Sequence, residues 1–89
     1  MERRRINFSG HVQGVGFRAT TRHIAESYGL TGWVRNEPDG GVTVEVQGGA
    51  PEIELFLIDL RERMRGFIRD ERGDGLSVIE GEAEFRVLS

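Results

Sequence analysis

A glycine-rich bend and an arginine lie close together at residues 12–18, in the sequence VQGVGFR. Backbone N–H groups can converge in such a bend, and the helical pattern that follows it predicts a helix N-terminus with a positive partial charge. Arg18 falls in the first turn of that helix, where its guanidinium adds a full charge. An isolated arginine more often pairs with a nearby glutamate, but the combination of bend, helix start and arginine predicts a binding site for an anion.

The same glycines match the G-x-G-x-x-A pattern of dinucleotide-binding domains, because Gly14, Gly16 and Ala19 have that spacing. A parallel dinucleotide-binding sheet needs a helical crossover after its second strand. The sequence EPDGG at residues 37–41 instead predicts a turn into an antiparallel partner. A P-loop is disfavoured as well, because no G-K-[ST] follows the glycines.

The elements that would position these residues follow from the spacing of apolar side chains. Alternation of apolar and polar residues predicts a first strand over residues 6–12, a second over residues 30–36 and a third over residues 42–47. The third strand alternates valine with polar residues, so we expect it to be half-buried. Helical spacing predicts one helix over residues 17–28 and another over residues 51–64.

The pattern after the second helix is less regular. Residues 67–68 and 76–79 compete for the fourth strand, separated by the Gly-Asp-Gly of residues 73–75, and residues 85–88 predict a short final strand. The order β-α-β-β-α-β is typical of an α+β, ferredoxin-like sandwich in which two helices cover one face of an antiparallel sheet. We expect a single domain over residues 1–89.

The charge of the chain narrows the range of partners. With a net charge of −3, the chain lacks the surplus of Lys and Arg with which general nucleic-acid binders face phosphates. We interpret the run Arg3, Arg4 and Arg5 as a solvated, partly strand-forming terminus rather than a phosphate-seeking arm. The third strand carries none of the aromatic side chains on which an RNA-binding sheet stacks bases. We therefore expect no nucleic-acid partner, and a ferredoxin-like RNA or protein interaction domain stays an alternative.

Composition also limits the location and the chemistry. No window has the roughly 20 apolar residues that a membrane-spanning helix needs, so we expect a cytoplasmic protein that does not bind membranes. The chain contains no cysteine, which excludes thiolate catalysis and thiolate metal sites. His11 and His23 have no metal-ligand spacing and are expected on polar surfaces, so no metal site is predicted. We interpret Tyr28 and Trp33 as packing residues.

Two motifs, VQGVGFR at residues 12–18 and GWVRN at residues 32–36, together resemble the paired signature of the acylphosphatase family. The resemblance continues through the second helix and then weakens, because this chain lacks the Gly-Pro-rich turn that the family commonly has there. It implies that Asn36 orients a water molecule. It also implies a phosphate-binding loop made of Val12, Gln13, Gly14, Val15, Gly16, Phe17 and Arg18.

The resemblance implies a small enzyme that hydrolyses the carboxyl-phosphate bond of acyl phosphates, with Arg18 and Asn36 as its catalytic residues. A carboxylate leaves without needing a proton, so no general acid is required, and phosphoryl transfer depends mainly on positioning and charge stabilisation. We expect a monomer without a cofactor, and competition between the substrate and inorganic phosphate or sulfate. The alternative is a module that binds carbamoyl phosphate or another small phosphorylated ligand without turnover.

Overall fold

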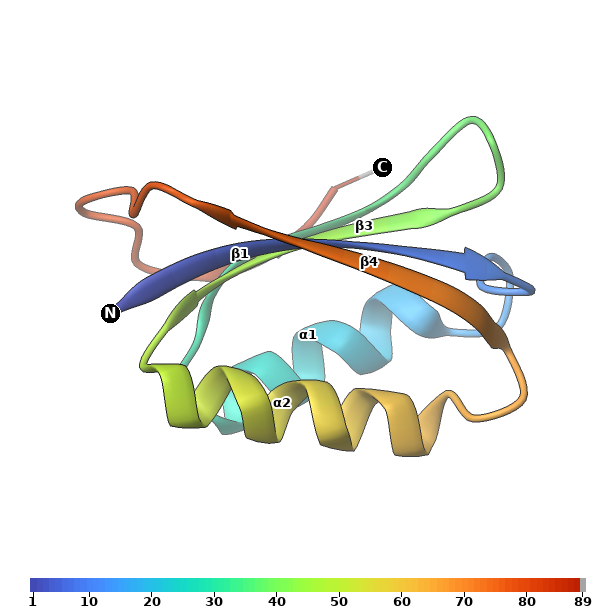
Figure 1. Ribbon diagram of the computed structural model, residues 1–89, viewed down its shortest axis with the longest axis horizontal. Helices are drawn as coiled ribbons and strands as arrows, with labels where there is room; N and C mark the ends of the chain where they lie inside the picture. The colour runs from blue at the N-terminus through green and yellow to red at the C-terminus, as the bar shows by residue number, and fades with distance from the viewer. Residues whose placement is uncertain (89) are drawn as a thin grey trace.

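The computed structural model describes residues 1–88 and shows a five-stranded sheet with both helices on one face (Figure 1). Ser89, the last residue of the predicted domain, lies outside the described residues. Neither described helix is long and apolar enough to cross a membrane. In chain order the elements are β1 (Glu2–Gly10), α1 (Phe17–Ser27), β2 (Thr31–Asn36), β3 (Val42–Gly48), α2 (Ala50–Arg63), β4 (Ile68–Leu76) and β5 (Phe85–Val87).

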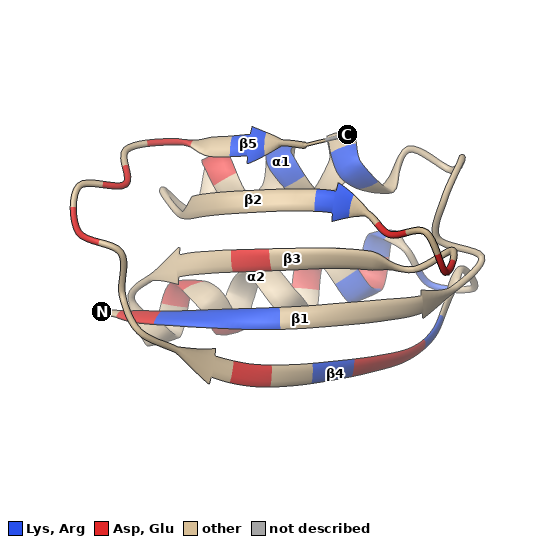
Figure 2. Ribbon diagram, turned by 90° about the horizontal axis from the view of Figure 1, so that it is seen from above, with Lys and Arg blue, Asp and Glu red and all other residues tan. Residues whose placement is uncertain are grey.

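The sheet has the strand order β4-β1-β3-β2-β5, which can be followed across Figure 2. β1 pairs with β4 and β3, β3 pairs with β2, and all of these pairings are antiparallel. β5 joins the other edge of β2 and runs parallel to it, with Val87 opposite Val34. The layout confirms the predicted ferredoxin-like α+β fold and adds a parallel edge strand, which makes the sheet mixed.

The core lies between the sheet and the two helices. Ile6 and Phe8 of β1 and the valines of β3 face the helices, where buried apolar residues of α1 and α2 meet them. The rings of Phe8 and Phe17 pack with their centroids 5.2 Å apart, so the first strand contacts the first turn of α1 directly. This packing holds the start of α1 against the sheet.

The opposite, open face of the sheet is more buried than the sequence predicts. β3 is expected to be half-buried, but Thr43, Glu45 and Gln47 are buried as well. Glu45 accepts hydrogen bonds from Arg3 Nε at 2.9 Å and from Arg5 Nη2 at 2.8 Å, and these long side chains cover the strand. The expectation of a solvated basic terminus is therefore wrong for Arg3.

Arg3 is buried because carboxylates surround it. Its Nη1 donates to Glu82 at 2.8 Å, in addition to the bond from Nε to Glu45. Burial acts to lower the pKa of Arg3, but the two carboxylates outweigh this effect and raise the pKa, so the guanidinium stays charged. Paired carboxylates offset the cost of burying this charge.

Two strand boundaries differ from the prediction. The first strand is predicted to reach residue 12, but β1 ends at Gly10, where its pairing with β4 shifts register and its backbone passes close to that of Phe67. Residues 73–75 are predicted to interrupt the fourth strand, but they lie within β4, opposite residues 4–6. Backbone pairing requires no side chain, so the long partner β1 carries β4 through these glycines. Of the competing segment at residues 76–79, only Leu76 belongs to the strand.

Candidate active site

The glycine-rich bend lies between the end of β1 and the start of α1. Gly14 and Gly16 have φ angles of 76° and 78°, in the left-handed region that other residues rarely adopt. No neighbouring atom lies within 4 Å of the place where a Cβ would stand at either position. The backbone conformation, rather than a lack of space, therefore requires glycine in the bend.

α1 begins without a cap from any side chain. Gly16 is the N-cap residue, no side chain bonds to the first turn, and that turn contains no acidic residue. The N–H of Thr20 donates to the carbonyl of Gly16 at 3.0 Å, and the N–H groups of residues 17–19 have no acceptor inside the helix. The start of α1 therefore presents backbone donors and a positive partial charge.

Arg18 and Asn36 lie on one cavity of about 270 Å³ at this helix start. Asn36 is the last residue of β2 and pairs with Val42, which places it on the helix-facing side of the sheet. The structure thus brings together the two motifs that the sequence paired. The cavity is lined by Val12, Gly14, Gly16, Phe17, Arg18, Ala19, Asn36 and Val87.

Arg18 has no carboxylate partner among residues 1–88. Its Nη1 donates to the carbonyl of Leu88 over a long 3.4 Å, which is a weak contact. Most other arginines of the chain form ion pairs, as Arg22 does with Glu26 one turn further along α1. Arg18 is half-buried beside the cavity, and no acid among residues 1–88 lies where it would compete with an anion there.

The carboxylate that follows Asn36 in the chain lies away from this cavity. Glu37 lines a hollow on the open face of the sheet and pairs with Arg35 at 3.1 Å. The Thr43 hydroxyl and the Arg35 guanidinium lower the pKa of Glu37, which keeps it ionised at neutral pH. Because successive side chains point to opposite faces of the sheet, the negative charge of Glu37 lies away from the cavity beside Arg18.

Gln13 and Val15 belong to the predicted loop, but their side chains do not line the cavity. Gln13 Nε2 donates to the carbonyls of Glu37 at 2.8 Å and Gly41 at 2.9 Å. These bonds tie the bend to the turn between β2 and β3. Val15 packs against the core. Both residues therefore support the bend through contacts that the sequence did not predict.

Ala19 and Val87 line the cavity although the sequence analysis predicts neither of them as a site residue. Ala19 follows Arg18 in the first turn of α1, so its helical position could have indicated it. Val87 carries no local signal, because its place depends on the parallel pairing of β5 with β2. The cavity thus combines a predictable part with a part that only the tertiary fold provides.

The histidines, Tyr28 and Trp33, which the sequence analysis also considered, do not line the cavity. His11 and His23 are exposed, as predicted, and no metal-binding group of three His, Cys, Asp or Glu occurs within residues 1–88. Tyr28 packs against the core, as predicted. Trp33 lies on the open face with the Arg35 guanidinium 4.8 Å above its ring, and it does not line the cavity.

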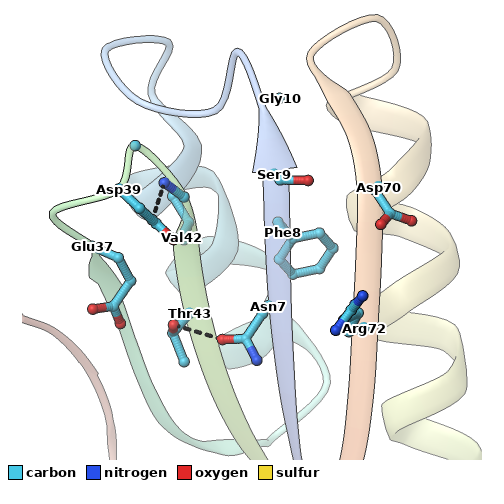
Figure 3. Close-up of a pocket in the computed structure, with 12 residues that line it drawn as sticks. Asn7, Phe8, Ser9, Gly10, Glu37, Asp39, Val42, Thr43, Asp70 and Arg72 are labelled. Carbon is cyan, nitrogen blue, oxygen red and sulfur yellow. Dashed lines mark hydrogen bonds between the residues drawn. The ribbon is translucent and has the colours of Figure 1, made fainter.

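A second cavity, of about 290 Å³, lies on the open face between β1, β3 and β4 (Figure 3). Its lining includes three carboxylates, those of Glu37, Asp39 and Asp70, and a single arginine, Arg72. This balance of charge repels an anion. The cavity beside Arg18 is therefore the better candidate for binding a phosphate group.

The fold and the cavity define a class of protein, a ferredoxin-like domain with a glycine-rich bend and a cavity at an uncapped helix N-terminus. The model of the acylphosphatase family matches residues 4–83. An acylphosphatase of Geobacillus kaustophilus is 38% identical over 99% of this chain and 95% of its own length. The crystal structure of acylphosphatase from Bacillus subtilis covers all of both chains, with a TM-score of 0.91 and 29% identity.

The chain therefore belongs to the acylphosphatase family. It is an enzyme, and these comparisons confirm the predicted activity, the hydrolysis of acyl phosphates. A similar structure also occurs as a small part of a longer protein. Full-length HypF in a phosphate- and nucleotide-bound form matches 99% of this chain but only 12% of its own, with a TM-score of 0.90 and 32% identity.

Proposed function

We propose that the bend at residues 12–18 and Arg18 bind the phosphate group of an acyl phosphate, and that Asn36 orients the water that attacks it. The observation that carries this proposal is the uncapped start of α1, which shares one cavity with Arg18 and Asn36. Backbone N–H groups and the guanidinium would donate to the phosphate oxygens and stabilise their charge during the reaction.

The reaction needs few groups because its leaving group is a carboxylate. The water oxygen forms a bond to phosphorus while the bond from phosphorus to the acyl oxygen breaks, and the carboxylate leaves with that electron pair and without a proton. No carboxylate or histidine among residues 1–88 lines the cavity. We therefore propose that an oxygen of the phosphate itself accepts the proton of the attacking water.

The location, oligomeric state and ligands of the protein are also part of the proposed function. We propose that it acts as a cytoplasmic monomer without a cofactor, that inorganic phosphate and sulfate compete for the same bend, and that nucleic acid does not bind. The open face of the sheet supports the last point. Its central acid, Glu45, is occupied by Arg3 and Arg5, so these arginines are already paired.

Asn36→Ala tests whether water orientation can be separated from phosphate binding. We expect kcat for benzoyl phosphate to fall about 10²- to 10³-fold, as when one preorganised polar group is removed, while the Ki of inorganic phosphate stays within about twofold of wild type. Steady-state hydrolysis in the presence of EDTA measures both constants. The proposal uses no metal, so a need for an added metal ion contradicts it.

Asn7→Ala is the matched control, because Asn7 lies on the open face and its amide oxygen accepts a bond from Thr43 at 2.8 Å (Figure 3). We expect this variant to keep the wild-type kcat. If Asn36→Ala also turns over at the wild-type rate, the amide does not orient the water. If Asn36→Ala instead raises the Ki of phosphate in proportion to the loss of activity, Asn36 binds phosphate rather than water.

A further inference from the structure

The cavity beside Arg18 has a polar part and an apolar part. Among residues 1–88, Arg18 is the only charged side chain in its lining, and the N–H groups at the start of α1 lie beside it. Of the apolar lining residues, Val12 and Phe17 are buried in the core. Ala19 and Val87 are exposed at the rim. If the phosphate group binds at the polar part, the acyl group of the substrate has to extend past these two side chains.

β5 fixes the position of Val87. The N–H of Leu88 donates to the carbonyl of Val34 at 2.8 Å, and the carbonyl of Leu88 accepts the contact from Arg18. Val87 stands opposite Val34 in this parallel pair and faces α1, as does the buried Phe85 two residues before it. With 39% of its surface exposed, Val87 keeps apolar area available to a ligand.

Among residues 1–88, the charged side chains that line the hollow on the far side of Val87 are already paired. On its other side Val87 lines a neighbouring hollow together with two arginines and two glutamates. Arg22 pairs with Glu26 at 3.3 Å, and Arg86 pairs with Glu84 at 3.0 Å. Within residues 1–88 this hollow offers no unpaired charge to an acyl group that carries a second carboxylate or an ammonium, whereas an apolar acyl group would cover Val87.

We propose that Val87 determines specificity by contacting the acyl group of the substrate, and that it selects acyl phosphates with a neutral, apolar acyl group. This inference rests on the proposed phosphate site. Val87 lies beyond residues 4–83, which the family model matches, whereas the bend and Asn36 lie inside that range. The phosphate-binding part and the acyl-binding part thus come from different segments of the chain.

The test compares benzoyl phosphate, which has an aromatic acyl group, with acetyl phosphate, which has a single methyl group. The wild-type protein should have the higher kcat/KM for benzoyl phosphate. Val87→Ala removes two methyl groups from a partly exposed contact and should lower the ratio of the two kcat/KM values by about fivefold. Val87→Thr keeps the shape but replaces one methyl group with a hydroxyl, so it should lower the ratio in a protein that folds as the wild type does.

Val78→Ala is the matched control, because Val78 has the same exposed fraction, 39%, and does not line the cavity. It should leave the ratio unchanged. A ratio that both Val87 variants leave at the wild-type value, or a wild-type protein that prefers acetyl phosphate, would overturn the inference while hydrolysis itself still stands. Failure of the phosphate site would appear separately, as a wild-type kcat/KM in an Arg18→Ala variant.

Discussion

The two helices of this protein begin in opposite electrostatic settings. Each has a glycine as its N-cap residue, Gly16 in α1 and Gly49 in α2, and neither has a side-chain cap. The first turn of α2 contains Glu52, whose carboxylate lies so close to Gly49 that an added Cβ would collide with it. The first turn of α1 contains Arg18 and no acid. α2 therefore supplies its own anion, whereas the start of α1 keeps its donors and its positive partial charge available, as the proposed phosphate site requires.

A single position accounts for much of this difference. The third residue after the N-cap glycine is Glu52 in α2 and Ala19 in α1. An acid there lies beside the unpaired N–H groups and fills the place that a ligand would take. A helix start with free donors, an adjacent arginine and no acid is thus better evidence for a bound anion than glycines alone.

The largest effect is expected when Arg18 is removed, because Arg18 is the side chain proposed to bind the phosphate at the start of α1. Arg18→Ala should lower kcat/KM by about 10³-fold through the loss of two charge-assisted hydrogen bonds. Arg18→Lys should be nearly as inactive, because an ammonium cannot reproduce the planar grip of a guanidinium on two phosphate oxygens. Thermal unfolding should change little, since the contact with Leu88 is weak.

Arg22→Ala provides the control for Arg18, because Arg22 lies one turn further along α1 and is exposed beside Glu26. Its kcat/KM should stay within about twofold of wild type, as for most exposed pairs. A lysine variant at position 18 that keeps most of the wild-type kcat/KM would mean that Arg18 acts as a remote charge. The site would then lack its two-pronged phosphate contact.

The second largest effect is expected when the first turn of α1 is given an acid, as the first turn of α2 has. Ala19→Glu places a carboxylate at the position that corresponds to Glu52, beside the donors of the bend. We expect helix stability to rise by about 0.3–1 kcal/mol and kcat/KM to fall about 10²-fold, because the carboxylate repels the substrate anion and occupies its donors. Urea unfolding and acyl phosphate hydrolysis measure the two effects.

Ala19→Gln separates charge from size in this experiment, since the amide has nearly the same volume as the carboxylate. It should lose less activity than Ala19→Glu, and it should bind inorganic phosphate more tightly than Ala19→Glu does. If kcat/KM falls equally in the two variants, the cause is crowding beside Arg18 rather than charge. The helix start would then not be the source of the anion affinity.

The part of the site that local chemistry encodes could be predicted from the sequence. Gly14 and Gly16 have the left-handed backbone that a glycine-rich bend suggests, and Arg18 lies in the first helical turn. Asn36 ends β2, as the turn signal after it indicates. Each of these features depends on neighbours within a few residues, so the pattern contains the information. Their roles in binding and water orientation stay predictions.

The rest depends on partners that are far away in the sequence. Glu45 has the pattern of an exposed strand residue, but Arg3 and Arg5 pair with it across the sheet, and Arg3 also pairs with Glu82 from the segment after β4. Val87 reaches the cavity only because β5 pairs with β2. Tertiary contacts override local preference at such positions, so periodicity cannot find them.

The smallest effect is expected at α2, where the comparison predicts a change in stability without a change in activity. Glu52→Ala removes the acid beside the α2 N-terminus and should cost about 0.5–1 kcal/mol in the free energy of unfolding, measured with urea at low salt. The loss should shrink at high salt, because interactions of exposed charges with a helix end are screened.

Glu62→Ala is the control for Glu52→Ala. It removes an acid from the last turn of α2, where a negative charge opposes the dipole and pairs with exposed Arg65, so it should change stability much less. Both variants should keep the wild-type kcat/KM, since neither residue lines the cavity. Equal destabilisation by the two variants would show that Glu52 acts through general surface charge, and the contrast between the two helix starts would then rest on Arg18 alone.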